Sequence, residues 1–93
     1  QSLADQIPPT AQAVILRLGR MQYMDQSGLY AMEDVLQELQ RKQVIPLFVD
    51  IQDQPRYMMS RIDIIPDLVP EEHIFESFRA CVAWVRENIP DTV

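Results

Sequence analysis

The stretch Tyr23-Met24-Asp25-Gln26-Ser27-Gly28-Leu29 joins an apolar segment to an amphipathic one and decides how the rest of the chain is organised. Residues 13–18 before it read Ala-Val-Ile-Leu-Arg-Leu, an apolar run without alternation that predicts a short strand covered on both faces. After it, apolar residues recur at helical spacing, namely Leu29, Met32, Val35, Leu36 and Leu39. The change of period predicts a tight polar turn between a strand and a helix.

The turn has the residue types of a helix start. Asp25 and Ser27 both belong to the types that cap helix N-termini. Gly28 lacks a Cβ, so the backbone there can come close to a neighbour or a partner. The polar turn is therefore both a structural cap and a candidate contact surface.

A second strand is predicted directly after this helix. The helix should end near Lys42-Gln43, and residues 44–49 form another apolar run. Two buried strands joined by a helix predict parallel pairing with a right-handed crossover. Pro46 cannot donate to a ladder, so this strand either lies near a sheet edge or has that position turned outward.

Two further helices are predicted in the second half of the chain. Residues 56–62 form a short one, with Met58, Met59 and Ile62 filling the core rather than forming a pliable binding surface. The last helix spans roughly Phe75 to Asn88 and ends before a proline. Its predicted apolar stripe consists of Phe78, Cys81, Val82, Val85 and Ile89.

Composition bounds the class of protein. A chain of 93 residues, 47% hydrophobic and 24% charged, fits a single globular domain, here residues 1–93. The 14 acidic and 8 basic residues give a formal charge of −6, which disfavours nucleic acid or an anionic membrane surface as the partner. No apolar run reaches the roughly 18 residues of a membrane helix. Proteins are the expected partners.

The residues that could carry chemistry are few. His73 is the only histidine, so a catalytic Ser-His pair would require His73 beside Ser27. Metal ligands do not occur at a recognised spacing, and no glycine-rich phosphate loop is present. The single cysteine, Cys81, excludes an internal disulfide and is predicted to be a buried thiol. We predict no enzyme activity, no catalytic residues, no metal and no cofactor.

The unit of apolar strand, Asp25-Gln26-Ser27-Gly28, amphipathic helix and second strand resembles the STAS domain, which anti-sigma factor antagonists share with the cytoplasmic tails of SulP (sulfate permease) anion transporters. The resemblance covers roughly Leu3 to Ile89, and its ending is closer to the transporter branch. STAS domains begin with one or two further strands that this sequence lacks, so we expect the N-terminal strand or strands to be missing. The other segments that carry the resemblance are residues 37–42, 44–49, 71–75 and 83–84.

The resemblance implies an α/β fold, a small β-sheet with helices packed mainly on one side. It implies a cytoplasmic regulatory and protein-interaction domain of a SulP-type transporter of sulfate or another anion, on the cytoplasmic face of the membrane. The implied partners are other proteins and the transporter's own membrane domain, with a homodimer formed through the parent transporter. A nucleotide or an anion is the candidate ligand.

The alternative that the resemblance leaves open is a free signalling protein of the antagonist type. In that branch the serine before the glycine is phosphorylated by the anti-sigma kinase, and Ser27 matches this place. A helix N-terminus favours a phosphate electrostatically. The candidate regulatory and partner-binding residues are therefore Asp25, Gln26, Ser27 and Gly28.

Overall fold

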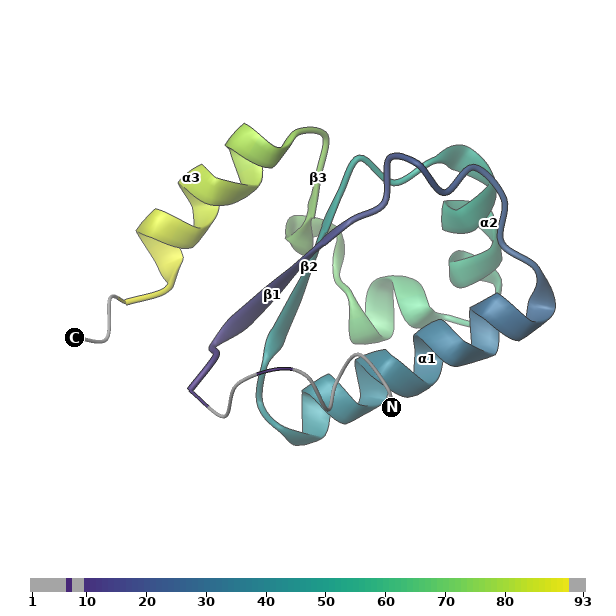
Figure 1. Cartoon of the computed structure of the whole chain (residues 1–93), viewed down its shortest axis with the longest axis horizontal. Coiled ribbons are helices and arrows are strands. Elements are labelled where there is room, and N and C mark those ends of the chain that lie inside the picture. Colours follow the sequence, from purple (N-terminus) through teal and green to yellow (C-terminus); the bar gives the residue numbers. More distant parts are fainter. Residues whose placement is uncertain (1–6, 8–9, 91–93) are drawn as a thin grey trace.

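Three parallel strands form the sheet, in the order β1-β2-β3, in a computed structural model that describes residue 7 and residues 10–90 (Figure 1). The strands are β1 (Ala13–Arg17), β2 (Ile45–Val49) and β3 (Ile74–Phe75). The α-helices are α1 (Gln26–Arg41), α2 (Asp53–Arg61) and α3 (Phe78–Asn88). A π-helical turn, η2 (Ile64–Leu68), and a 3-10 turn, η3 (Glu71–His73), connect α2 to β3. The predicted α/β fold is confirmed.

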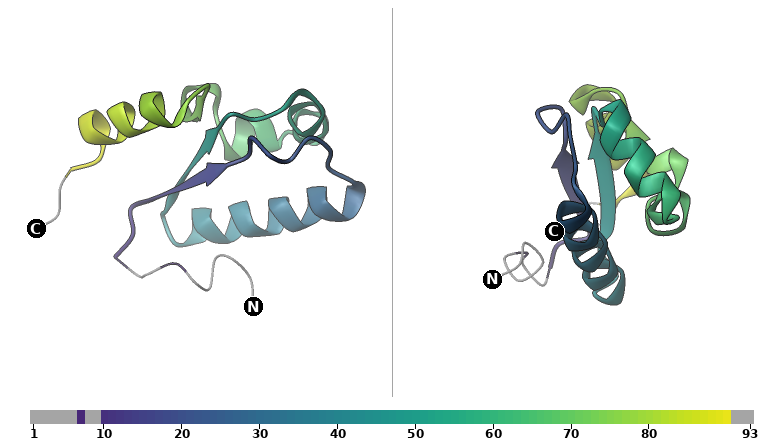
Figure 2. Two further views of the ribbon diagram at one scale, coloured as in Figure 1. Left: turned by 45° about the horizontal axis from the view of Figure 1, so that its top comes forward. Right: turned by 90° about the vertical axis from the view of Figure 1, so that its right-hand side faces the viewer.

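The helices are divided unequally between the two faces of the sheet. In Figure 1 the strands run between α3 on one side and α1 with α2 on the other, and the left view of Figure 2 shows the same separation from another direction. Neighbouring residues of β2 point to opposite faces, because Phe48 belongs to the core cluster under α1 whereas Leu47 and Val49 pack with Cys81 of α3. The prediction of helices mainly on one side is confirmed.

The first strand is less covered than its sequence predicts. Four of its five residues are only half-buried and Arg17 is exposed, whereas Pro46 to Val49 in β2 are buried. Within the described residues β1 pairs only with β2, so its other edge has no ladder partner. The expectation of a strand covered on both faces is therefore wrong for this part of the chain. The expectation of a preceding strand stays a prediction.

Pro46 lies in the central strand, at a position that needs no hydrogen-bond donor. Ile45 N donates to Gln12 O at 3.0 Å on the β1 side, and Asp50 N donates to Phe75 O at 2.9 Å on the β3 side. Because donors alternate along a parallel strand, the nitrogen of Pro46 faces the β3 side. There β3 reaches only Phe48 and Val49, so β2 has no ladder partner on that side at Pro46, although the residue is buried and the strand is central.

The start of the last helix differs from the prediction. Phe75 belongs to β3, and α3 begins at Phe78 because Ser77 caps it, its Oγ accepting from Ala80 N at 3.1 Å. Cys81 is fully buried, but Phe78, predicted on the buried stripe, is 41% exposed. Helical periodicity could not reveal a two-residue strand, since so short a run has no period of its own.

The second helix begins earlier than predicted. It starts at Asp53, which places Pro55 in the first turn. Backbone N–H groups in the first turn have no acceptor within the helix, so the N–H that proline lacks costs no helical hydrogen bond there. Met59 is fully buried and Met58 and Ile62 are half-buried against the same core, so these residues fill the interior as predicted. The following turn η2 packs on α2 and α1.

Candidate functional site

The turn between β1 and α1 is a capped helix start. Asp25 has an extended backbone, and its Oδ1 accepts from Gly28 N at 2.8 Å. The first helical bond runs from Leu29 N to Asp25 O at 2.9 Å. The side chains of Asp25, Gln26 and Ser27 are exposed, so three of the four predicted site residues form a continuous polar surface at the start of α1.

The structure assigns the cap to one of the two candidates. Asp25 is the N-cap, and Ser27 is the second residue of α1, with an exposed side chain that makes no hydrogen bond to a described residue. Gln26 donates from Nε2 to Tyr30 Oη at 3.4 Å across one helical turn. Of the two capping types in the turn, Asp25 is thus the one that caps α1, and the Ser27 hydroxyl is not used for capping.

The local structure explains why glycine stands at position 28. A Cβ at this position would lie 3.3 Å from Asp25 Oδ1 and 3.6 Å from Met24 Cγ, close enough to crowd the capping carboxylate. Its φ is negative, so no left-handed conformation demands glycine. Gly28 serves the cap, and the predicted close approach is to residues of the turn itself.

Gln54 was not among the predicted site residues, yet it holds the turn from the neighbouring helix α2. Met24 N donates to Gln54 Oε1 at 2.6 Å, and Gln54 Nε2 donates to Met24 O at 3.0 Å. One side-chain amide thus satisfies both backbone groups of the residue before the cap, as a neighbouring strand would. These bonds join residues 30 positions apart, and neither residue carries a sequence signal for the pairing.

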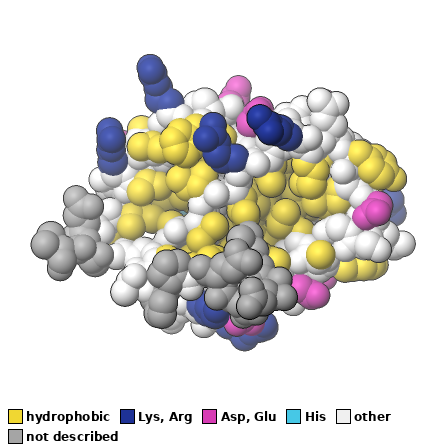
Figure 3. All heavy atoms as spheres, viewed as in Figure 1, with side chains coloured by type: hydrophobic (Ala, Val, Ile, Leu, Met, Phe, Trp, Pro, Cys, Tyr) yellow, Lys and Arg dark blue, Asp and Glu magenta, His cyan; other side chains and the backbone are white. Residues whose placement is uncertain are grey.

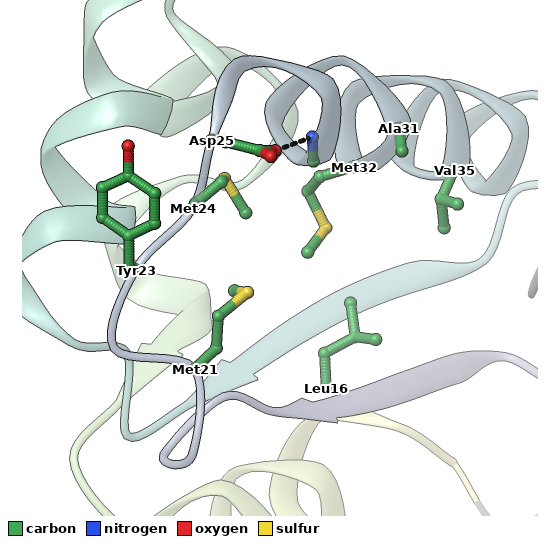
Figure 4. Close-up of a pocket in the computed structure, with 9 residues that line it drawn as sticks. Leu16, Met21, Tyr23, Met24, Asp25, Ala31, Met32 and Val35 are labelled. Atoms are coloured by element: carbon green, nitrogen blue, oxygen red, sulfur yellow. Dashed lines mark hydrogen bonds between the residues drawn. The ribbon is translucent and has the colours of Figure 1, made fainter.

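A groove of about 420 Å³ lies beside the turn, between β1 and α1. Figure 4 shows Met21, Met24 and Met32 converging on it, with Leu16 below and the Tyr23 hydroxyl pointing away. Tyr23 is 71% exposed, so the groove is bordered by a large aromatic side chain in solvent. Figure 3 shows that hydrophobic side chains are open to solvent on one face of the molecule. The polar turn therefore borders an accessible apolar surface.

The other candidate chemistry does not assemble. His73 packs edge-on against Trp84 with ring centroids 5.0 Å apart, and the structure gives no bond from it to Ser27. Burial in an apolar setting raises the pKa of the Cys81 thiol, which makes it a poor nucleophile. Among the described residues no group of histidine, cysteine or carboxylate side chains is arranged to hold a metal ion.

Within residue 7 and residues 10–90, no helix combines the length and apolarity needed to cross a bilayer.

The comparisons with known proteins agree with this geometry. The sequence matches the model of the STAS domain over residues 1–81. The chain belongs to the STAS domain family. No curated protein sequence matches it. The resemblance seen in the sequence is thereby confirmed at the level of the family.

Two solved structures match the fold. A sulfate transporter family protein from Wolinella succinogenes has a TM-score of 0.80 and 24% identity, over 91% of this chain and 69% of its own. The SulP transporter STAS domain from Vibrio cholerae also has a TM-score of 0.80, with 22% identity over 94% of this chain and 67% of its own. At these identities the likeness establishes a shared fold.

Proposed function

We propose that this STAS domain is the cytoplasmic regulatory and protein-interaction domain of a SulP-type transporter of sulfate or another anion. The observation that carries the proposal is the fold, which superposes on the STAS domain of a SulP transporter over 94% of the chain. The role is regulatory rather than catalytic, in keeping with a turn whose groups are used for capping. The domain works at the cytoplasmic face of the membrane and contacts the transporter's membrane domain.

The contact surface in this proposal is the start of α1. Its first turn presents backbone N–H groups and the positive end of the helix dipole, beside the exposed side chains of Asp25, Gln26 and Ser27. The apolar groove bordered by Tyr23 adds area of the kind that protein interfaces bury. The proposed occupant is a protein partner.

Deleting the domain from the parent transporter tests the regulatory role. We expect a changed transport rate, abundance or partner binding, while the membrane portion still recognises its anion. The measurements are substrate uptake, the amount of protein in the membrane, and competition by unlabelled anions. Loss of anion recognition by a folded membrane portion would contradict the proposal, because it would place the binding site in this domain.

A second candidate is supported by one observation, the unbonded Ser27 hydroxyl on the first turn of α1. In this alternative the domain is a free signalling protein of the anti-sigma factor antagonist type, switched by phosphorylation of Ser27. Ser27→Asp should lower affinity for an acidic partner while α1 stays formed, because the new charge lies beside Asp25.

Ser60→Asp is the matched control for that substitution. Ser60 is likewise an exposed serine on an α-helix, but it lies in α2. If both variants bind a partner of the wild-type domain equally well, and both unfold at the wild-type temperature, the turn is only a helix cap.

A further inference from the structure

A second cavity, of about 600 Å³, lies at the carboxyl ends of the strands. It shares no lining residue with the groove beside Asp25. Its lining comes from the last residues of β1 and β2 and from the segments that follow the three strands, and consists of Arg17, Gly19, Arg20, Val49, Asp50, Glu76, Ser77 and Phe78. These residues come together only when the three strand ends meet.

The cavity lies where the connections that leave the strands diverge to opposite faces of the sheet. The chain leaves β1 and β2 toward α1 and α2 on one face of the sheet, and leaves β3 toward α3 on the other. The connections therefore diverge at this edge. In open parallel sheets a crevice outside the carboxyl ends, where connections diverge to opposite faces, is where ligands bind. The chemistry of the ligand then depends on the lining.

Two arginines, Arg17 and Arg20, are the basic residues of that lining. The Arg17 guanidinium carbon lies 4.4 Å from the centroid of the Phe78 ring, which fixes the side chain at the start of α3. The ion pairs among the described residues involve Arg41 and Arg56, and neither Arg17 nor Arg20 takes part. Each guanidinium presents five N–H donors. The donors of both arginines are therefore available to a ligand in the cavity.

The two carboxylates of the lining are placed differently. Asp50 Oδ2 lies so close to the backbone of Gly19 that a Cβ there would overlap it, and Asp50 Oδ1 accepts from Gln52 Nε2 at 3.4 Å. Glu76 is exposed and forms no ion pair with a described residue. Asp50 is thus turned toward the β1 and β2 loops, and neither carboxylate occupies the arginines.

We propose that this cavity binds a small tetrahedral oxyanion of the sulfate or phosphate class, held by Arg17 and Arg20. Planar guanidinium forks match the oxygen spacing of such anions and form charge-assisted bonds to them. The chain carries a formal net charge of −6, yet this lining brings two of its 8 basic residues together. The inference goes beyond the proposed function and does not depend on the parent transporter.

An NMR titration tests the proposal directly. The backbone amide spectrum of the protein is followed while sodium sulfate, sodium phosphate or sodium chloride is added at constant total ionic strength. We expect the two oxyanions to shift the amides of residues 17–20, 50 and 76–78, with saturation, and chloride to leave them in place. Shifts of equal size with chloride would overturn the proposal, because at constant ionic strength they would reflect unselective association of anions with the surface.

Substitutions identify the arginines as the ligands. Arg20→Gln and Arg17→Gln should each weaken oxyanion binding by roughly tenfold, the loss expected for charge-assisted hydrogen bonds. Arg20→Lys keeps the charge without the fork, and should weaken binding less. Arg86→Gln is the control, because Arg86 is exposed on α3 and does not line the cavity. Unchanged affinity in both glutamine variants, with native spectra, would overturn the assignment.

Discussion

The two faces of the sheet differ in how many buried side chains pack on them. The face under α1 and α2 holds eleven buried residues in one cluster, whereas the face under α3 holds three, Leu47, Val49 and Cys81. The proposed regulatory turn belongs to the first face, and the arginine cavity lies where the second face begins. Because fewer buried side chains hold α3 than hold α1 and α2, we expect α3 to open more readily than the half of the domain that carries the partner surface.

The largest expected loss of stability comes from a substitution that leaves a cavity in the larger core cluster, under α1 and α2. Leu36 on α1 is 1% exposed, so Leu36→Ala should lower the free energy of unfolding by about 2 to 5 kcal/mol through lost burial and the cavity it leaves. Val85 packs half-buried under α3, and Val85→Ala should cost about 1 kcal/mol. Urea denaturation measures both. Equal costs would mean that the two faces contribute alike.

The next effect concerns the link between the turn and α2. In Gln54→Glu the introduced carboxyl can replace both bonds to Met24 only while protonated, so its pKa should be raised in the folded state. The stabilisation from these two bonds is then fully present at pH values below the unfolded pKa of the carboxyl, about 4.3. It is lost as the pH rises through the folded pKa. At pH 7 the variant should be roughly 1 to 3 kcal/mol less stable than wild type.

Gln54→Ala is the control for this pH dependence, since it removes both bonds at every pH. Thermal unfolding of the two variants, each compared with wild type between pH 4 and pH 7.5, separates the cases. A stability difference for Gln54→Glu that does not change with pH would show that the Gln54 amide does not hold the turn. Amide exchange at residues 25–28 reports whether the turn loosens before the domain unfolds.

A smaller effect is expected at the cap. Asp25→Ala removes the acceptor of the Gly28 N–H and should cost about 0.5 to 2 kcal/mol. Ser27→Ala should change the stability by less than about 0.5 kcal/mol, because its side chain is exposed and caps nothing. Urea midpoints of the two variants compare them directly. A larger loss in Ser27→Ala than in Asp25→Ala would reverse the assignment of the cap.

The smallest effect probes α3 through its cysteine. Cys81 is fully buried and its thiol pKa is raised by burial, so a thiol reagent at pH 8 should react only when α3 opens. We expect the opening free energy from labelling to be lower than that of global unfolding, because few apolar contacts hold α3. Labelling rates at increasing urea concentrations measure it. Labelling that follows global unfolding alone would show that both faces open together.

Much of the fold was predictable from short-range patterns. The apolar runs at residues 13–18 and 44–49 became β1 and β2, and the helical spacing from Leu29 to Leu39 became α1. These features depend on neighbours within a few positions along the chain, which a single sequence contains. The family resemblance rests on the same local unit around Asp25-Gln26-Ser27-Gly28.

The tertiary structure alone decided which segments that are distant in the sequence come into contact. The two-residue strand β3 exists because β2 offers it a ladder partner, and Gln54 reaches Met24 because α2 packs beside the turn. Arg17 and Arg20 gain a possible ligand only where three strand ends converge. The sequence by itself determined the elements and the capped turn, since those follow from local spacing. Which side chains meet depended on the packing of the sheet, which brings residues 30 or more positions apart into contact.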